Sequence, residues 1–422
     1  MSPAPWLLDL TRLQSRAGRA RTGIDRVERA WLAAALDRPG PVFGLLRSAL
    51  GVLLLDRAGM ARFAAAHDAD AWGGIDRLSW LARRLDPARA AAESLSRSLS
   101  VARAPRALLG PMLRRHVPPG ALYLNVGHAH LEPATLRAVR RAGLRVVVLV
   151  HDTLPLDLPW AARPGTPAPF DAKLRAVARH ADRVIVTARA TARDVERHLA
   201  RHGRVPDIAV APLGVSVARP DPAALPPGLD LSAPYMVALG TIEPRKNHAL
   251  LLDVWAALGP AAPRLYICGA RGWNNDAVFA RLDAGVAGVT ELPGLSDGAV
   301  AALLAGARAL VFPSLAEGYG LPPLEAAAMG VPVLCADLPV CRELLGDAAV
   351  YLDPRDRYGW EAALRAAATR PPAQPGLAPP GWARHVALAL AGLDAAGAEA
   401  AVEETGVNTG EGTGCSRGRD TG

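Results

Sequence analysis

The 422-residue chain is poor in the features that mark several protein classes. It has only four cysteines, whose spacing forms neither a disulfide framework nor a CxxC zinc pattern, so we expect a reducing, cytoplasmic compartment. No uninterrupted apolar run approaches the length of about 18 residues that a membrane span needs, and Arg47 and Gly51 interrupt the best candidate, residues 42–55. Asp9 and the lack of a basic region before the first apolar run argue against a secretory signal.

Lysine is nearly absent, and the remaining positive charge is unevenly distributed. Lys173 and Lys246 are the two lysines, which suggests a need for a compact ammonium group where a lysine is kept. Residues 1–213 carry 33 Lys and Arg against 18 Asp and Glu, whereas the remainder carries 15 against 22. Without aromatic-rich basic clusters or a zinc-finger pattern, this favours anionic lipid headgroups or a phosphate-bearing substrate over nucleic acid. Solvated arginines without a function are the alternative.

The remaining sequence alternates short apolar, β-branched runs with longer helical stretches, which is the pattern of βαβ units. Two successive sets of such units predict an α/β protein with two doubly wound domains. The expected strands are 6–10, 42–46, 122–126, 145–150, 183–187 and 208–211 in the first half, and 235–239, 264–268, 289–292, 309–312, 332–336 and 349–352 in the second.

Proline and composition divide the chain into segments. Five prolines between residues 218 and 234 stop helices and central strands and predict a hinge. Residues 56–117 are expected to be a mostly helical insertion, and the Gly-, Thr- and charge-rich end is expected to be disordered. The predicted segments are a first domain at 1–217 with its insertion at about 56–117, a linker at 218–234, a second domain at 235–370, a linker with a helix at 371–398, and a tail at 399–422.

Ligands of open α/β sheets bind beyond the carboxyl ends of the strands, so residues that follow each strand are the candidate site. His151 follows 145–150, Arg245 and Lys246 lie in the loop after 235–239, and Glu317 follows 309–312. These positions predict a glycine-bordered cleft that carries two cations, an imidazole and a carboxylate.

The run FPSLAEGYGLPPLEAAAMG carries the most specific signal. Its Gly-Tyr-Gly loop precedes a helix, whose first backbone N–H groups, at Gly320 and Leu321, are suited to a diphosphate. Glu325, inside the helix, offers two acceptor oxygens to vicinal hydroxyls such as those of a ribose, and Glu317 can reach a second polyol.

Together with GTIEPRKN upstream, this run resembles the retaining family-4 glycosyltransferases of GT-B fold, also described as glycosyl transferases group 1. The resemblance is close over residues 235–354. It is looser over RTGIDRVERAW, YLNVGHAHL, VVLVHDTLPLDLP, ADRVIVTARATARDV and APLGV. The insertion and the tail match no family that we would name.

The resemblance implies a GT-B fold, with two Rossmann-like domains facing across a cleft, and a role for each matching residue. Arg245 and Lys246 would bind the donor diphosphate, Glu325 the ribose and Glu317 the donor sugar, while His151 would face the reaction centre from the other domain. The full set of implied donor-binding residues is Gly23, Gly240, Thr241, Arg245, Lys246, Gly269, Glu317, Gly318, Tyr319, Gly320, Leu321 and Glu325. Ala188 departs from the family, which often carries Ser there, and this puts one polar contact of that loop in doubt.

The implied activity is transfer of a hexose, with mannose among the candidates, from a nucleotide sugar to a glycan or lipid-linked acceptor. Configuration would be retained, without a cofactor or metal, in cell-surface polysaccharide or lipopolysaccharide synthesis at the inner face of a membrane. A catalytically silent GT-B scaffold that binds glycans or partners and a nucleotide-sugar epimerase remain alternatives. A dinucleotide-dependent oxidoreductase is disfavoured because no GxGxxG opens a helix after a strand.

Other polar residues are weaker candidates. His128 and His130 have a residue type suited to a metal, but the absence of a carboxylate cluster favours structural or acceptor-side roles. Asp68 and Asp70 are in a helical context, so we do not expect them to bind a metal. For Arg271 and Trp273, a donor-side role and a structural one are equally open.

Overall fold

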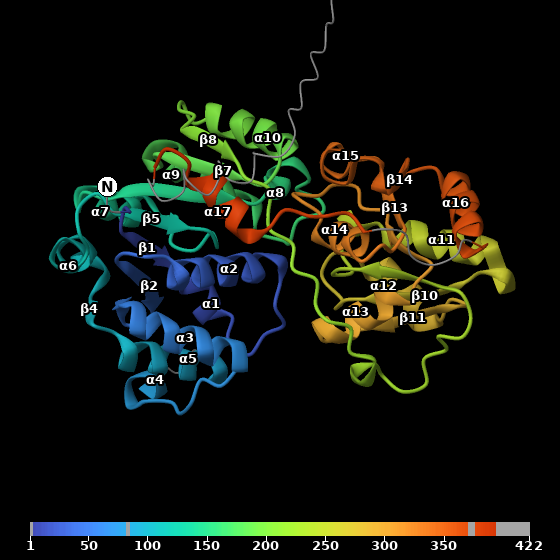
Figure 1. Ribbon diagram of the computed structural model, residues 1–422, viewed down its shortest axis with the longest axis horizontal. Coiled ribbons are helices and arrows are strands. Elements are labelled where there is room, and N and C mark those ends of the chain that lie inside the picture. Colours follow the sequence, from blue (N-terminus) through green and yellow to red (C-terminus); the bar gives the residue numbers. More distant parts are fainter. Residues whose placement is uncertain (1–2, 82–84, 370–375, 394–422) are drawn as a thin grey trace, which may run out of the picture.

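The chain folds into two α/β units, each built on its own sheet, that lie side by side in the computed structural model (Figure 1). The structure describes residues 3–81, 85–369 and 376–393. The sequence-predicted tail at 399–422 lies outside this range, as does part of the segment at 371–398. All twelve expected strands are present, with ends that differ by at most two residues from those expected.

The first sheet has eight strands in the order β4-β3-β2-β1-β5-β6-β7-β8, and β1, β2 and β5 to β8 pair in parallel. Its central strands are continuous apolar runs, such as RVVVLV in β6, because helices cover both faces. The strands are β1 (Trp6–Asp9), β2 (Val42–Ser48), β3 (Gly51–Leu55), β4 (Ala102–Ala104), β5 (Leu122–Asn125), β6 (Arg145–Val150), β7 (Arg183–Val186) and β8 (Asp207–Val210).

Ten helices accompany this sheet in the described part of the chain. The longest, α2, begins after a capping box in which Thr22 and Asp25 satisfy each other's backbone N–H groups. The helices are α1 (Thr11–Ser15), α2 (Gly23–Asp37), α3 (Arg57–Ala69), α4 (Arg77–Leu81), α5 (Pro87–Leu99), α6 (Leu109–His116), α7 (Pro133–Arg141), α8 (Leu154–Asp157), α9 (Pro167–His180) and α10 (Arg189–Ala200).

One edge of the first sheet differs from the doubly wound arrangement that the sequence predicts. β3 pairs antiparallel with β2, and β4 pairs antiparallel with β3, so this sheet is not wholly parallel. Residues 56–117 supply α3 to α6, as expected, but also β4, which we did not expect within a helical insertion. The insertion therefore extends the sheet as well as covering it.

The second sheet has six strands, all parallel, in the order β11-β10-β9-β12-β13-β14. The strands are β9 (Tyr235–Leu239), β10 (Arg264–Cys268), β11 (Val289–Leu292), β12 (Ala309–Phe312), β13 (Val333–Ala336) and β14 (Ala349–Leu352). The helices are α11 (His248–Leu258), α12 (Asp276–Ala284), α13 (Asp297–Ala305), α14 (Leu321–Ala328), α15 (Pro339–Leu345) and α16 (Arg357–Thr369). This parallel, doubly wound arrangement is the expected one.

Residues 218–234 contain one short 3-10 turn and no strand or longer helix, and they join the two units. The chain then returns: α17 (Trp382–Leu390) follows the second unit but packs against α2 and β8 of the first. One continuous cluster of buried apolar side chains runs through both units and includes Leu390 of α17. Within the part of the chain that the structure describes, no helix is long and apolar enough to cross a membrane.

His385 anchors α17 in the first domain. It is fully buried, accepts a hydrogen bond from the Trp31 indole N–H at Nε2, and donates from Nδ1 to the Ala211 carbonyl. Burial lowers its pKa to about 4, so the imidazole is neutral in the folded protein near pH 7.

We predict that His385→Gln lowers the free energy of unfolding by about 1–3 kcal/mol at pH 7.5, because buried hydrogen bonds are lost. A lowered folded-state pKa stabilises the fold above the unfolded value near 6.5, and this contribution falls as the pH drops towards 4. The difference between wild type and variant should therefore shrink by about 1–2 kcal/mol between pH 7.5 and pH 5. Chemical denaturation at both pH values measures it.

Leu390→Ala, also in α17, is the control, since it removes buried apolar contacts but no titrating group. Its cost should be similar at the two pH values. A His385→Gln difference that is independent of pH would contradict the assigned state of His385.

Candidate functional site

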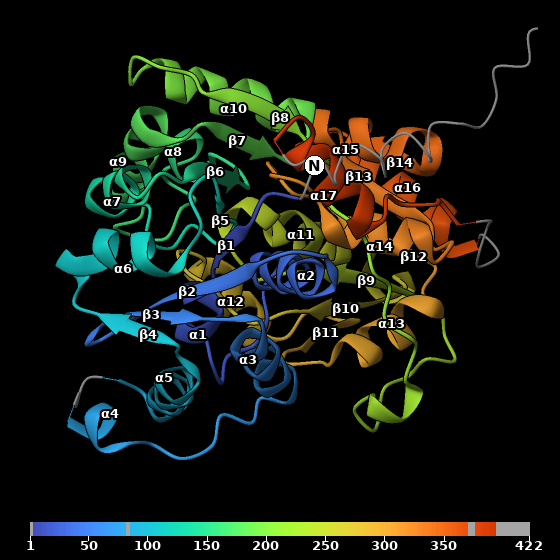
Figure 2. The ribbon, with the colours of Figure 1, turned by 60° about the vertical axis from the view of Figure 1, so that its left-hand side comes forward.

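The carboxyl ends of the central strands of both sheets meet at the boundary between the two domains. A cavity of about 320 Å³ between α2 and α14 is lined from both domains. α10 of the first domain and α15 of the second lie side by side in both views (Figures 1 and 2). Residues far apart in the sequence therefore form one interdomain cleft.

A buried cluster of charges lies in this cleft, where the loops after β9 and β12 meet. Glu317 pairs with Lys246 Nζ at 2.6 Å and with Arg245 Nη1 at 2.8 Å. Arg245 also pairs with Glu243 at 2.7 Å, and the Lys246 ammonium lies 4.3 Å from the centre of the Phe312 ring. The two cations are thus held at fixed positions by short contacts.

The charge states in this cluster follow from burial and from its ion pairs. Burial would raise the pKa of Glu317, but Arg245 and Lys246 lower it to about 2, so this carboxylate is ionised at neutral pH. Burial lowers the pKa of Lys246, and Glu317 opposes that shift. The pKa of Glu243 is raised because its burial outweighs the attraction of Arg245.

The N-terminus of α14 provides the second part of the site. Gly320 caps this helix with φ of 102°, a left-handed conformation that glycine adopts without strain. Pro322 and Pro323 have no backbone N–H, so the available donors are those of Gly320 and Leu321, and no side chain caps them. The positive end of the helix dipole and these free donors form a site suited to an anion.

Glu325, one turn into α14, is buried and pairs with Arg26 of α2 at 2.6 Å, so this contact crosses from one domain to the other. Burial raises the pKa of Glu325 and Arg26 partly offsets the increase. Gly23, at the start of α2, lies near Leu321, since a Cβ added there would be 3.5 Å from the Leu321 side chain.

At Gly318 the backbone of the second domain lies against the first domain. A Cβ on Gly318 would lie 2.7 Å from the His151 carbonyl and from Asp152 Cβ. The Gly318 carbonyl accepts hydrogen bonds from the Thr191 hydroxyl at 2.8 Å and from the Thr187 hydroxyl at 3.4 Å. The first domain therefore binds the backbone next to Glu317 through these hydrogen bonds.

His151 and Asp152 bring the end of β6 to the charge cluster. His151 donates from Nε2 to the Val126 carbonyl at 2.7 Å, and burial lowers its pKa to about 4, so its ring is neutral. The adjacent Asp152 is close enough to Arg245 and Glu317 for both to affect its pKa, which burial raises overall. The structure therefore places His151 beside the predicted donor site, with Asp152 facing the cations.

The loop at Ala188 has polar contacts, although Ala188 stands where the family often carries Ser. The backbone N–H groups of Arg189 and Ala190, at the start of α10, donate to Glu343 of α15 at 2.7 and 3.0 Å. Together with the threonine hydroxyls at either side of Ala188, these amides hold the first domain against the second.

The other donor-binding candidates surround the charge cluster. Gly240 and Gly269, at the ends of β9 and β10, are in backbone contact, and the Lys246 side chain packs on Gly240. Thr241 follows Gly240 and lies against Gly272. Tyr319 is buried and donates from its hydroxyl to the Leu213 carbonyl of the first domain, which is a structural contact between domains.

Arg271 and Trp273 have structural partners. Arg271 pairs on the surface with Glu291 and Asp283, at 2.6 and 2.7 Å. Trp273 donates from its indole N–H to the Ala161 carbonyl across the domain boundary.

His128, His130, Asp68 and Asp70 also have hydrogen-bond or ion-pair partners within the first domain. His128 contacts the Leu149 carbonyl, and His130 contacts Asp9 at 2.9 Å. Asp68 pairs with Arg29, and Asp70 accepts from Gly18 N and the Trp72 indole. Across residues 3–81, 85–369 and 376–393, no group of three or more metal-ligating side chains occurs.

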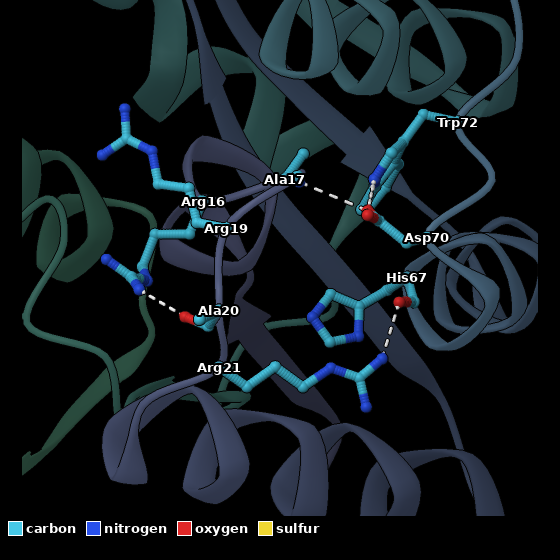
Figure 3. Close-up of a pocket in the computed structure, with 9 residues that line it drawn as sticks. Arg16, Ala17, Arg19, Ala20, Arg21, His67, Asp70 and Trp72 are labelled. Atoms are coloured by element: carbon cyan, nitrogen blue, oxygen red, sulfur yellow. Dashed lines mark hydrogen bonds between the residues drawn. The ribbon is translucent and has the colours of Figure 1, made fainter. Parts of the chain in front are cut away.

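A second hollow of about 350 Å³ lies beside the cleft in the first domain (Figure 3). The loop at residues 16–21 forms one wall, and His67, Asp70 and Trp72 from the insertion form the other. Arg21 extends below the His67 ring and donates to the His67 carbonyl. Because Arg21 also lines the cavity at Glu325, the two hollows adjoin.

Sequence analysis assigned no role to several charged residues of the cleft, among them Arg26, Glu243 and Asp152. Glu243 and Asp152 do have a signal, because each lies next to a predicted residue in a loop that follows a strand. Arg26 has none of this kind, since it is inside a helix and reaches its partner only when the domains are assembled.

The two facing α/β units define a two-domain GT-B fold, in which the second domain carries a helix N-terminus suited to an anion. A family model described as Glycosyl transferases group 1 matches residues 233–370. Residues 233–370, which make up the second domain, therefore resemble a group 1 glycosyltransferase domain.

Two curated relatives are mannosyltransferases of Escherichia coli. The serotype-specific mannosyltransferase WbdA is 33% identical over 244 residues, which are 53% of this chain and 30% of the relative. The O-antigen chain mannosyltransferase B is 38% identical over 128 residues, which are 29% of this chain and 33% of the relative. The chain spans about a third of the length of these relatives.

Solved structures share the architecture over most of the chain. Anabaena Alr3699/HepE, in complex with UDP and glucose, has a TM-score of 0.57 at 15% identity and covers 95% of this chain and 99% of its own. Sucrose-phosphate synthase (tll1590) from Thermosynechococcus elongatus has a TM-score of 0.54 at 14% identity, with 86% and 89% covered. At these identities the likeness establishes the fold.

We predict that Gly318→Ala destabilises the domain contact, because the added methyl group would overlap the His151 carbonyl and Asp152. Overpacking of this kind costs about 1–3 kcal/mol, and thermal unfolding should report a lower midpoint. Gly74→Ala is the control, since a Cβ there meets no atom within 4 Å. Equal midpoints for the two variants would contradict the close approach of the domains at Gly318.

Proposed function

We propose that this protein transfers a hexose, most directly mannose, from a nucleotide sugar to a glycan or lipid-linked acceptor in surface polysaccharide synthesis. The observation that carries the proposal is the buried cluster of Arg245, Lys246 and Glu317 beside the free N-terminus of α14. Buried charges are costly to desolvate, so a cluster of this kind beside a helix N-terminus is a candidate functional site as well as a link between two loops.

The cluster fits the chemistry of the proposed donor. When the bond from the sugar to the diphosphate breaks, negative charge develops on the phosphate and positive charge at the anomeric carbon. Arg245, Lys246 and the α14 amides would stabilise the diphosphate, and Glu317 would lie at the sugar. Glu325 would accept hydrogen bonds from the ribose.

Retention of configuration and independence from metal belong to the same proposal. The acceptor hydroxyl would attack from the face that the phosphate leaves, and that phosphate would take the proton. His151 is neutral and already donates to Val126, so its proposed role is to shape the cleft and contact the sugar. The two fixed cations would supply the charge stabilisation that a metal ion provides elsewhere.

The choice of sugar and acceptor rests on the relatives. Both E. coli proteins are named as mannosyltransferases, and the name of one also refers to the O-antigen chain. For this chain we propose that the acceptor approaches over the first domain, past the hollow at residues 16–21. The basic charge of that domain supports peripheral contact with an anionic, inner membrane face.

The direct test is a transfer assay with labelled GDP-mannose, UDP-glucose and UDP-N-acetylglucosamine, with mannan oligosaccharides and lipid-linked glycans as acceptors. We predict acceptor-dependent release of nucleotide and an α-linked product from an α-linked donor. Activity should be unchanged by EDTA. Sugar release or isomerisation without acceptor, or no turnover with any pair, would contradict the proposal and favour an epimerase or a silent scaffold.

A second prediction concerns the charge of Glu317. Glu317→Gln should tighten binding of the nucleoside diphosphate severalfold, because Arg245 and Lys246 lose a competing carboxylate. Transfer should nevertheless fall by about 10²-fold or more, in the range seen when one electrostatic contact to a transition state is removed. Calorimetric titration and the transfer assay measure the two effects. Weaker nucleotide binding in the variant would contradict the competition.

A further inference from the structure

Arg26 is a feature of the cleft for which neither the family match nor the motifs give a role. It lies in the first turn of α2, in the first domain, and its Nη2 is 2.6 Å from Glu325 Oε1 in the second domain. The same guanidinium donates to the Ser216 carbonyl at 3.3 Å, near the start of the linker. Arg26 therefore joins both domains and the approach to the hinge.

We propose that Arg26 is a positioning residue for the donor nucleotide, which holds one oxygen of Glu325 across the cleft and leaves the other to the ribose. This inference rests on the proposed function, because it assigns the carboxylate of Glu325 to the ribose hydroxyls. It adds a contribution from the first domain to a site that the motifs place wholly in the second.

The two oxygens of Glu325 have different surroundings. Oε1 is fully enclosed, and its close contact with Arg26 is an ion pair without the alignment of a hydrogen bond. Oε2 is not among the enclosed atoms and receives no hydrogen bond from any residue in the described ranges. Glu325 also lines the cavity of about 320 Å³ between α2 and α14. The open oxygen therefore has room beside it for a hydroxyl donor.

The position of Arg26 is built into the start of α2. The capping box of Thr22 and Asp25 fixes the first turn of this helix, and Arg12 and Arg16 pair with Asp25 at 2.9 and 2.8 Å. The backbone from which Arg26 extends towards Glu325 is therefore fixed.

Arg26 also keeps Glu325 in the form that accepts hydrogen bonds. Burial raises the pKa of Glu325, and Arg26 is the main group that opposes this shift. Asp297 of α13 raises it further, and the other charged groups that line the same cavity are Arg21, Asp25 and Arg29. Loss of Arg26 would favour the neutral acid, whose hydroxyl oxygen is the poorer acceptor.

The test is a thermodynamic cycle that combines removal of the Arg26 guanidinium with removal of the ribose 2′-hydroxyl. UDP, GDP and their 2′-deoxy counterparts are titrated calorimetrically into wild type, Arg26→Ala and Arg26→Lys, with thermal unfolding to check the fold of each. Arg342→Ala is the matched control, because Arg342 also pairs with a single carboxylate, Asp337, but outside the cleft.

We expect the nucleotide that binds wild type to lose about tenfold in affinity without its 2′-hydroxyl, a change equivalent to about 1.4 kcal/mol. In Arg26→Ala the ribonucleotide should weaken by about tenfold while the deoxynucleotide changes little. Arg26→Lys should restore part of the difference, and Arg342→Ala should match wild type.

Other results would overturn the inference. Equal weakening of both nucleotides in Arg26→Ala would assign Arg26 to general folding of the cleft, and tighter binding would make it a competitor of the ribose. Failure of every nucleotide to bind wild type would instead remove the proposed function, and the inference with it, before any variant is compared.

Discussion

The ion pairs of Glu317 with Arg245 and Lys246 are the interaction on which the cleft depends. They tie the loop after β12 to the loop after β9 and hold the buried Lys246 ammonium and the partly buried Arg245 guanidinium at fixed positions. Buried charges are tolerated only when they are paired, so this cluster constrains every group that touches it. The backbone N–H groups of Gly320 and Leu321, at the start of α14, follow a few residues further along the chain, and Gly318, next to Glu317, carries the contact with the first domain.

The domains are held in register by contacts that surround this cluster. Thr187 and Thr191 bind the Gly318 carbonyl, and the start of α10 binds Glu343. Behind the cleft, α17 follows the second domain in the chain but packs against the first, to which His385 is hydrogen-bonded. Because the chain crosses between the domains twice, a hinge motion is constrained, while the polar contacts in the cleft can be exchanged for a ligand.

Much of the fold could be predicted from the sequence, because parallel buried strands leave continuous β-branched runs that end in polar loops. The charge cluster and the helix N-terminus could be located for the same reason: Arg245, Lys246 and Glu317 each lie in a loop that follows a strand. The strands β3 and β4 were harder. β3 lies in the apolar stretch at 42–55, where the turn that separates it from β2 does not stand out in the sequence. β4 is only three residues long.

Arg26 shows what local patterns do not reveal. Its sequence context is that of an ordinary amphipathic helix, and its partner lies 299 positions away in the other domain. Similarly, the neutral state of His151 depends on burial in the folded protein, which its local sequence does not show. Residues that act across a domain boundary were therefore the part of the site that sequence reasoning could not supply.

A crystal structure of the protein with its nucleoside diphosphate tests the central claim most directly. The account predicts that the terminal phosphate lies within hydrogen-bond distance of Arg245, Lys246 and the first amides of α14, with the ribose on Glu325. A nucleotide bound elsewhere, or a diphosphate that leaves the ion pairs of Glu317 undisturbed and contacts neither cation, would contradict it.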